Sequence, residues 1–128
     1  MNRAFAGMLS IASVIAAATI SSLTLSGKFV VHRTYVNTSS YSVLATDYYL
    51  AASSTSLAVT INLPAVTSTP AGRMLIIKDK NGSAATHNIT ISPYGGNTID
   101  GATSFVLDKT TSSVSLINDA VGNWETLP

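Results

Sequence analysis

The residue types that usually carry chemistry are few in this chain and widely spaced. The two histidines, His32 and His87, lie far apart, and neither has another His, Asp or Glu at the spacing of a metal site. The chain has no cysteine, so it offers neither a thiolate nucleophile nor a disulfide. Serine never occurs as Gly-x-Ser-x-Gly, and no glycine-rich phosphate loop precedes a lysine. The sequence therefore predicts a protein that is not an enzyme and that holds no metal and no cofactor.

The carboxylates are explained better as turn residues than as catalysts. Asp79, Asp100 and Asp119 each stand beside a glycine-bearing turn, where aspartate is favoured because it hydrogen-bonds the local backbone. Together with Asp108 and Glu125 they could in principle supply a carboxylate pair for glycoside hydrolysis. The segment 97–101 also contains oxygen ligands that suit calcium, but too few are visible for a cage. We expect turn formation from these residues.

Aromatic side chains are the remaining candidates for ligand binding. Flat rings stack well on sugar faces, so a carbohydrate platform is one hypothesis. The aromatic residues concerned are Tyr41, Tyr48, Tyr49, Tyr94 and Trp124. Packing in the core or at a subunit interface accounts for most of them, because they fall on expected strands. Tyr94, beside the turn at Gly95-Gly96-Asn97, is the residue named as a ligand-binding candidate, and covering that turn is its alternative role.

The elements that would position these side chains are short strands. Apolar and polar residues alternate, and the pattern predicts strands over 29–36, 46–51, 57–63, 73–78, 88–92, 104–107, 113–118 and 124–127. Turn signals such as Asp100-Gly101 separate them. Within 73–78, the apolar run 74–77 suggests a strand that is buried on both faces. Seven to eight short strands at this spacing predict an all-β fold for 28–128, an antiparallel β-sandwich or a jelly-roll-like domain. No exact internal repeat is visible, which argues against a solenoid.

Composition limits the partners. Only 10% of the residues are charged and the net charge is +1, so the chain lacks the clustered Lys and Arg that nucleic-acid binding needs. A domain of this size has a small core, and association with copies of itself would bury further apolar surface. We therefore expect a homo-oligomer without a nucleic-acid partner.

Residues 1–27 differ from the rest, because no charge occurs between Arg3 and Lys28. Three interpretations are open. A secretory signal peptide fits the basic residue, the apolar stretch and the small residues that follow. A transmembrane helix fits poorly, because Ser and Thr dilute the apolar run, so we expect no membrane partner. The favoured interpretation is an apolar arm or helix that anchors the chain to a partner through one helical stripe. The anchoring residues on that stripe are Phe5, Met8, Leu9 and Ile15.

Several separated segments resemble, in matching order, a β module that recurs in structural proteins of tailed bacteriophages. They include Val-Thr-Ile-Asn-Leu-Pro-Ala at 59–65, Gly-Asn-Thr-Ile-Asp-Gly at 96–101 and Gly-Asn-Trp at 122–124, and the resemblance spans about 41–124. Such modules occur in head-decorating proteins and in fibres. The resemblance implies a β-rich virion component, commonly a homotrimer, and it brings no catalytic residues.

The resemblance and the apolar arm together predict a head decoration or cement protein on the exterior of the particle. Its β domain would form a homotrimeric knob, and residues 1–27 would contact the major capsid protein or another virion protein. One alternative is a tail or neck fibre piece with a receptor-binding role. A further alternative is a secreted or membrane-anchored carbohydrate-binding β-sandwich, which depends on a signal peptide in residues 1–20.

Overall fold

The structure is a computed structural model that describes residues 22–128. Residues Val31–Pro128 form one compact unit, which we call the β body. Residues 22–30 belong to a separate unit and contain neither helix nor strand. The strand expected over 29–36 is therefore shorter than predicted and begins only at Arg33.

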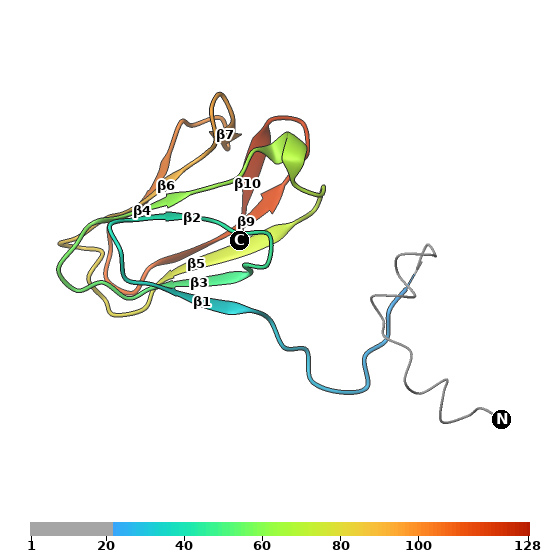
Figure 1. The fold of residues 1–128 in the computed structure, drawn as a ribbon, viewed down its shortest axis with the longest axis horizontal. Helices are drawn as coiled ribbons and strands as arrows, with labels where there is room; N and C mark the ends of the chain where they lie inside the picture. Colours follow the sequence, from blue (N-terminus) through green and yellow to red (C-terminus); the bar gives the residue numbers. More distant parts are fainter. Residues whose placement is uncertain (1–21) are drawn as a thin grey trace. The chain divides into compact units, whose positions relative to one another are not determined.

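The regular secondary structure of the described part of the chain consists almost entirely of short strands (Figure 1). Their bounds are β1 Arg33–Val36, β2 Ser40–Ser42, β3 Tyr49–Ala52, β4 Val59–Asn62, β5 Met74–Asp79, β6 Ile89–Ser92, β7 Thr98–Ile99, β8 Phe105–Leu107, β9 Ser113–Asn118 and β10 Asn123–Leu127. A single 3₁₀ turn, η1 Val66–Ser68, lies between β4 and β5. The predicted all-β fold is confirmed.

From β1 to β9, successive strands alternate between two sheets. The first sheet has the order β1-β3-β5-β9-β10-β7, and the second has the order β2-β4-β6-β8. Strands β1, β3 and β5 pair in parallel, and so do β2, β4 and β6. The chain thus winds three times around the two sheets, as in a short solenoid, before β8, β9 and β10 add antiparallel pairs.

This winding corrects two predictions. The expected antiparallel sandwich, with its jelly-roll variant, is wrong for the pairs among β1 to β6, which are all parallel. The fold is sandwich-like with two mixed sheets. The argument against a solenoid is also wrong for these strands. Arg33 pairs with Tyr49, and Tyr49 pairs with Ile76, so the successive turns of the winding differ in length and leave no exact repeat in the sequence.

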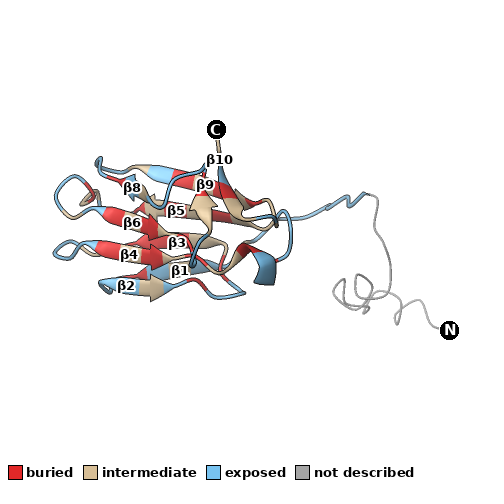
Figure 2. Cartoon of the chain, turned by 90° about the horizontal axis from the view of Figure 1, so that it is seen from above, coloured by how far each residue is buried: buried red, intermediate tan, exposed pale blue. Residues whose placement is uncertain are grey.

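The core lies between the two sheets (Figure 2). Alternate residues of each strand point inward, as a half-covered strand requires. The largest of the fully buried side chains are Trp124, Leu50, Ile61, Leu75, Ile77, Ile91, Ile99 and Leu116. Each such aliphatic side chain contributes roughly 1.5–3 kcal/mol when it leaves water. Within β5, Met74 and Ile76 are only half-buried, so the second face of this strand is less covered than predicted.

The predicted turn at Asp100-Gly101 is confirmed. Both residues have positive φ, 47° and 81°. Ile99 and Ala102 exchange two backbone hydrogen bonds of 2.8 Å across them, as in a two-residue β-hairpin. Glycine and a short polar side chain suit this backbone conformation, because bulkier residues are strained there.

Candidate functional site

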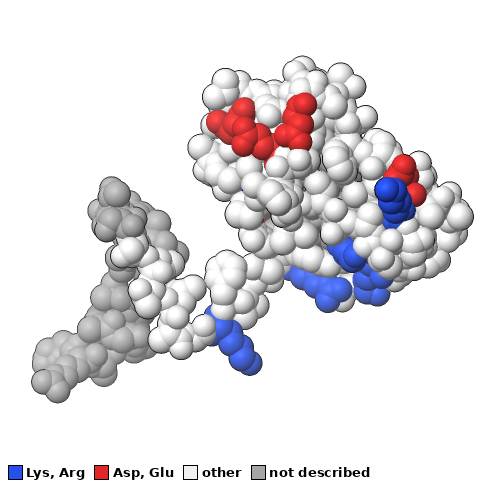
Figure 3. All heavy atoms as spheres, turned by 180° about the vertical axis from the view of Figure 1, so that it is seen from behind, with Lys and Arg blue, Asp and Glu red and all other residues white. Residues whose placement is uncertain are grey.

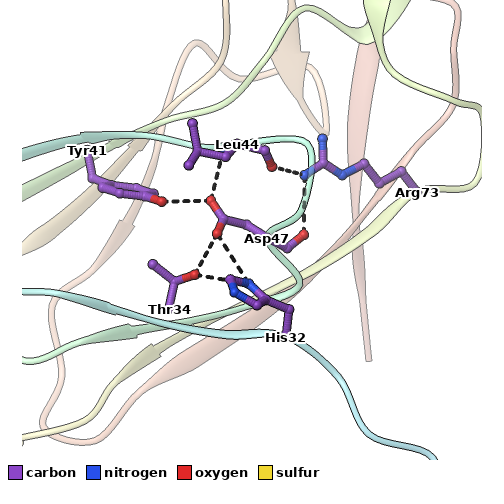
Figure 4. Close-up of polar contacts among 6 residues, drawn as sticks. All are labelled: His32, Thr34, Tyr41, Leu44, Asp47 and Arg73. Carbon is purple, nitrogen blue, oxygen red and sulfur yellow. Dashed lines mark hydrogen bonds and ion pairs between the residues drawn. The ribbon is translucent and has the colours of Figure 1, made fainter.

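A buried carboxylate organises a polar cluster in the β body (Figure 4). Asp47, in the loop before β3, is 4% exposed. Its Oδ1 accepts a hydrogen bond of 2.5 Å from the Thr34 hydroxyl on β1. Its Oδ2 accepts bonds of 2.9 Å from the Tyr41 hydroxyl on β2 and 2.8 Å from the Leu44 backbone N–H. One side chain therefore joins the first strands of both sheets to the loop that connects β2 with β3.

Two basic side chains border this cluster. The Nδ1 atom of His32 lies 3.7 Å from Asp47 Oδ1, and the His32 side chain is 58% exposed. The Arg73 guanidinium donates to the backbone carbonyls of Leu44 at 2.5 Å and of Asp47 at 3.2 Å. Arg73 thus holds the loop through its backbone, whereas His32 approaches the carboxylate from the solvent side.

The electrostatics of the cluster keep the Tyr41 hydroxyl protonated. Burial raises the pKa of the Tyr41 hydroxyl, and the hydrogen bond to Asp47 and its negative charge raise it further. Burial lowers the pKa of Arg73, and the Asp47 charge opposes that effect without cancelling it. A guanidinium stays protonated even so, because its ordinary pKa is far above neutrality. Tyr41 therefore remains a hydrogen-bond donor across the physiological pH range.

The Asp47–His32 pair resembles the orienting half of a nucleophilic triad, but the geometry supports a structural role. Among the described residues, the hydrogen bonds of the imidazole involve only the Thr34 hydroxyl, at 3.4 Å, and that hydroxyl already donates to Asp47. A triad needs a serine, threonine or cysteine that is free to give its proton to the imidazole. The cluster instead holds β1, β2 and the loop between β2 and β3 together.

We predict that Asp47→Ala lowers the free energy of unfolding by about 3 kcal/mol, because the Thr34, Tyr41 and Leu44 donors lose their acceptor. Tyr41→Phe, which removes one donor and keeps the ring, should cost about 1 kcal/mol. Urea unfolding followed by circular dichroism measures both. Equal unfolding midpoints for Asp47→Ala and the unsubstituted chain would contradict the assignment.

Sequence reasoning missed Asp47. The residue fell inside the strand expected over 46–51, and aspartate is depleted in strands. A charged residue inside an apolar alternation was the signal that could have identified a buried, paired carboxylate.

The other candidates from the sequence do not converge on one site. The carboxylates of Asp79 and Asp119 accept backbone N–H groups of turns, as predicted. His87 contacts the Thr86 hydroxyl at 3.0 Å. Within residues 22–128, no three His, Cys, Asp or Glu side chains gather as metal ligands.

Tyr94 lies in the loop between β6 and β7 and is 63% exposed. The anchoring candidates Phe5, Met8, Leu9 and Ile15 lie outside the described residues.

A second candidate site is the outer face of the first sheet, which points away from the core. Register places Arg33, Tyr49, Ile76, Ser115 and Leu127 in one row across it. Val31, Arg33 and Tyr49 line a shallow hollow of about 330 Å³. The Arg33 guanidinium lies 4.6 Å from the ring centre of Tyr35 and 5.5 Å from that of Tyr49. Half-buried apolar side chains beside stacked cations are typical of a protein-contact surface.

In the part of the chain from residue 22 onward, no helix has the length and apolarity needed to cross a membrane. No protein-family model matches the chain, and no curated protein matches it.

Proposed function

We propose that the chain is a non-enzymatic structural protein of a tailed-bacteriophage particle. It decorates the exterior of the head as a homotrimer of β bodies, and residues 1–27 attach it to the major capsid protein or to another virion protein. The resemblance of 41–124 to the recurrent phage module supports this proposal. The matching segments fall on strands and turns of the β body, around β4, the β7 turn and the start of β10. They are framework positions, so the resemblance concerns the fold and brings no catalytic groups.

The observation that carries the proposal is the exposed apolar character of residues 22–30. This segment contains neither helix nor strand, and Phe29 is 72% exposed. Leu23, Leu25 and Val30 are exposed as well. Four large apolar side chains exposed within one short segment favour contact with another molecule, because water disfavours such clusters. This composition is the one expected of a segment that attaches the chain to another molecule.

The main alternative is a tail or neck fibre piece with a receptor-binding role. Its supporting observation is the exposed Tyr94 ring in the loop between β6 and β7, which an aromatic contact to a receptor would use. The further alternative, a secreted or membrane-anchored carbohydrate-binding β-sandwich, requires removal or membrane insertion of residues 1–20. These alternatives predict different locations of the protein.

We predict that a chain lacking residues 1–26 loses attachment to the particle and keeps the fold of its β body. The β body is a compact unit from Val31 onward, so the deletion removes none of its residues. The measurement is co-sedimentation of the full and shortened chains with particles stripped of the native protein. Circular dichroism and thermal unfolding of both chains provide the control for folding.

Labelling of intact particles with antibodies against the β body distinguishes the alternatives. Label on the head supports decoration, and label on the tail or neck supports the fibre alternative. Undiminished attachment of the shortened chain would overturn the role of the arm. Mass spectrometry that finds the native protein without its first twenty or so residues would favour the secreted protein.

A further inference from the structure

Most of the acidic and most of the basic side chains visible in Figure 3 gather on different parts of the surface of the β body. The basic residues Arg33, on β1, Lys78, on β5, and Lys80, directly after β5, belong to the half of the sheet formed by β1, β3 and β5. The acidic residues Glu125, on β10, and Asp100, directly after β7, lie toward the β7 edge. Among residues 22–128, no Lys or Arg lies within 4.0 Å of an Asp or Glu side chain, and the single close pair is His32 with Asp47. The two charged edges are therefore not neutralised inside the β body.

The basic edge is held in place by aromatic rings. Arg33 stacks over Tyr35 and Tyr49, and the Lys80 ammonium lies 5.9 Å from the Tyr35 ring centre. Tyr35 itself is exposed. Such stacking orients the cations while leaving their N–H donors available to a carboxylate.

The acidic edge is equally well ordered. Both carboxylate oxygens of Asp100 lie within hydrogen-bond distance of the Thr126 backbone N–H, at 3.1 and 3.3 Å. One of them also accepts a bond of 2.5 Å from the Thr126 hydroxyl. Glu125 precedes Thr126 and is exposed. The pairing of Glu125 with Ile117, and of Ile117 with Met74, puts Glu125 on the outward face. Glu125 therefore faces outward close to the Asp100 carboxylate, and among residues 22–128 neither group has a Lys or Arg partner.

Apolar side chains cover part of the surface between the charged edges, beside Lys78 on β5 and Ser115 on β9. Met74, Ile76, Ile117 and Leu127 are half-buried on the outward face. Ala51 is fully buried, yet it does not belong to the core between the sheets, so its outward neighbours cover it. A face that combines apolar, aromatic and charged side chains in this way has the composition of a protein interface.

The β1 edge also lacks protection. Strand β1 pairs only with β3, and it contains no proline and a single charged residue. An open edge of this kind readily accepts contact with another chain.

We infer that the β1 edge of one copy docks against the β7–β10 edge of a second copy of this chain. Charge decides this orientation, because the head-to-tail contact brings Arg33 and Lys80 to Asp100 and Glu125. A two-fold contact of β1 with β1 would instead oppose cations. Head-to-tail contacts use two different surfaces of each copy and close into rings when the rotation allows. The inference rests on the self-association in the proposed function and names the surfaces that form it.

Charge exchange in the full chain tests this contact. Arg33→Glu and Glu125→Arg each place like charges in the interface, and each should weaken association by about tenfold or more. The double variant restores opposite charges and should recover the association. Lys109→Glu is the matched control, because Lys109 is exposed in the turn between β8 and β9 and lies on no strand of the first sheet. Analytical ultracentrifugation at micromolar concentration measures the mass as a multiple of 13.3 kDa.

The outcomes separate this inference from the proposed function. Loss of association in both single variants, recovery in the double variant and no change in Lys109→Glu support the contact. Association that persists in both single variants places the interface elsewhere, and the particle-attachment experiment is then unaffected. Weakening without recovery in the double variant contradicts the head-to-tail orientation. A chain with the mass of one copy at every concentration overturns the inference. Circular dichroism of each variant confirms that its β body is folded.

Discussion

Replacing Asp79 with alanine is expected to lower the free energy of unfolding by about 4 kcal/mol. The Asp79 side chain lies at the end of β5 and is 1% exposed. Its Oδ1 accepts the backbone N–H groups of Gly82 at 3.0 Å and Ser83 at 3.1 Å. Its Oδ2 accepts those of Ala84 and Thr111, both at 3.0 Å. The substitution leaves four donors of two different loops without their acceptor, so the β5–β6 and β8–β9 connections lose their common attachment.

Urea unfolding of Asp79→Ala measures this effect, and Asp108→Ala is the control, because Asp108 is exposed in a neighbouring loop. The pH dependence is a second readout. Burial acts to raise the pKa of Asp79, and the four backbone hydrogen bonds outweigh it, so the pKa lies below its ordinary value. A lowered pKa in the folded state means that the stabilisation is complete above about pH 4 and is lost as the pH falls through the folded pKa. Asp79→Asn, which cannot ionise, should reduce this acid-side slope. An unchanged slope, or an unchanged midpoint in Asp79→Ala, would contradict the prediction.

Strand positions could be predicted where the strand is long enough to alternate. The range predicted for β9, 113–118, is the observed one, and the predicted ranges for β4 and β6 contain the observed strands. Strands β2 and β7 were missed because they have three and two residues, too few for a period of two to show. Both strands lie beside turn-forming residues, so the sequence pattern around them indicated turns rather than strands.

The pairing of strands could not be predicted from the same pattern. An alternating strand looks alike whether its neighbour is parallel or antiparallel, because side-chain alternation depends on one strand alone. What decides the neighbour of β3 is the path of the chain through β2 and β4 in the second sheet. Since the turns of the winding differ in length, no repeat in the sequence indicated that path.

In the candidate sites too, local contacts could be predicted from the sequence and long-range contacts could not. Local chemistry predicted that Asp79 and Asp100 form turns through local backbone hydrogen bonds, and the Asp79 carboxylate does accept the N–H groups of its own turn. Asp100 does lie in a turn, but its carboxylate accepts the backbone N–H of Thr126 on β10 instead. Sequence reasoning could not show that Thr111, from a distant loop, also donates to Asp79. The separation of charge on the first sheet was equally hidden, because Arg33 and Glu125 become opposite ends of one surface only after the strands are ordered.

Trp124→Ala is expected to destabilise the β body by about 4 kcal/mol, as large-to-small substitutions of a buried aromatic residue do. Trp124 is fully buried and is the largest side chain of the core. It sits on β10, which pairs with β9 on one side and with β7 on the other. A cavity at this position would loosen the three strands that complete the first sheet after the parallel winding ends.

Trp124→Phe distinguishes the contribution of the ring volume to stability from the effect of the indole N–H. The indole Nε1–H of Trp124 has no hydrogen-bond partner among residues 22–128, and a buried donor without an acceptor is itself unfavourable. Phenylalanine removes that donor while it keeps most of the apolar volume, so we expect a loss of only about 1 kcal/mol. Because Trp124 is the single tryptophan of the chain, unfolding of both variants has to be followed by circular dichroism rather than by tryptophan fluorescence. Equal losses for the phenylalanine and alanine variants would contradict the view that the volume of the ring stabilises this part of the core.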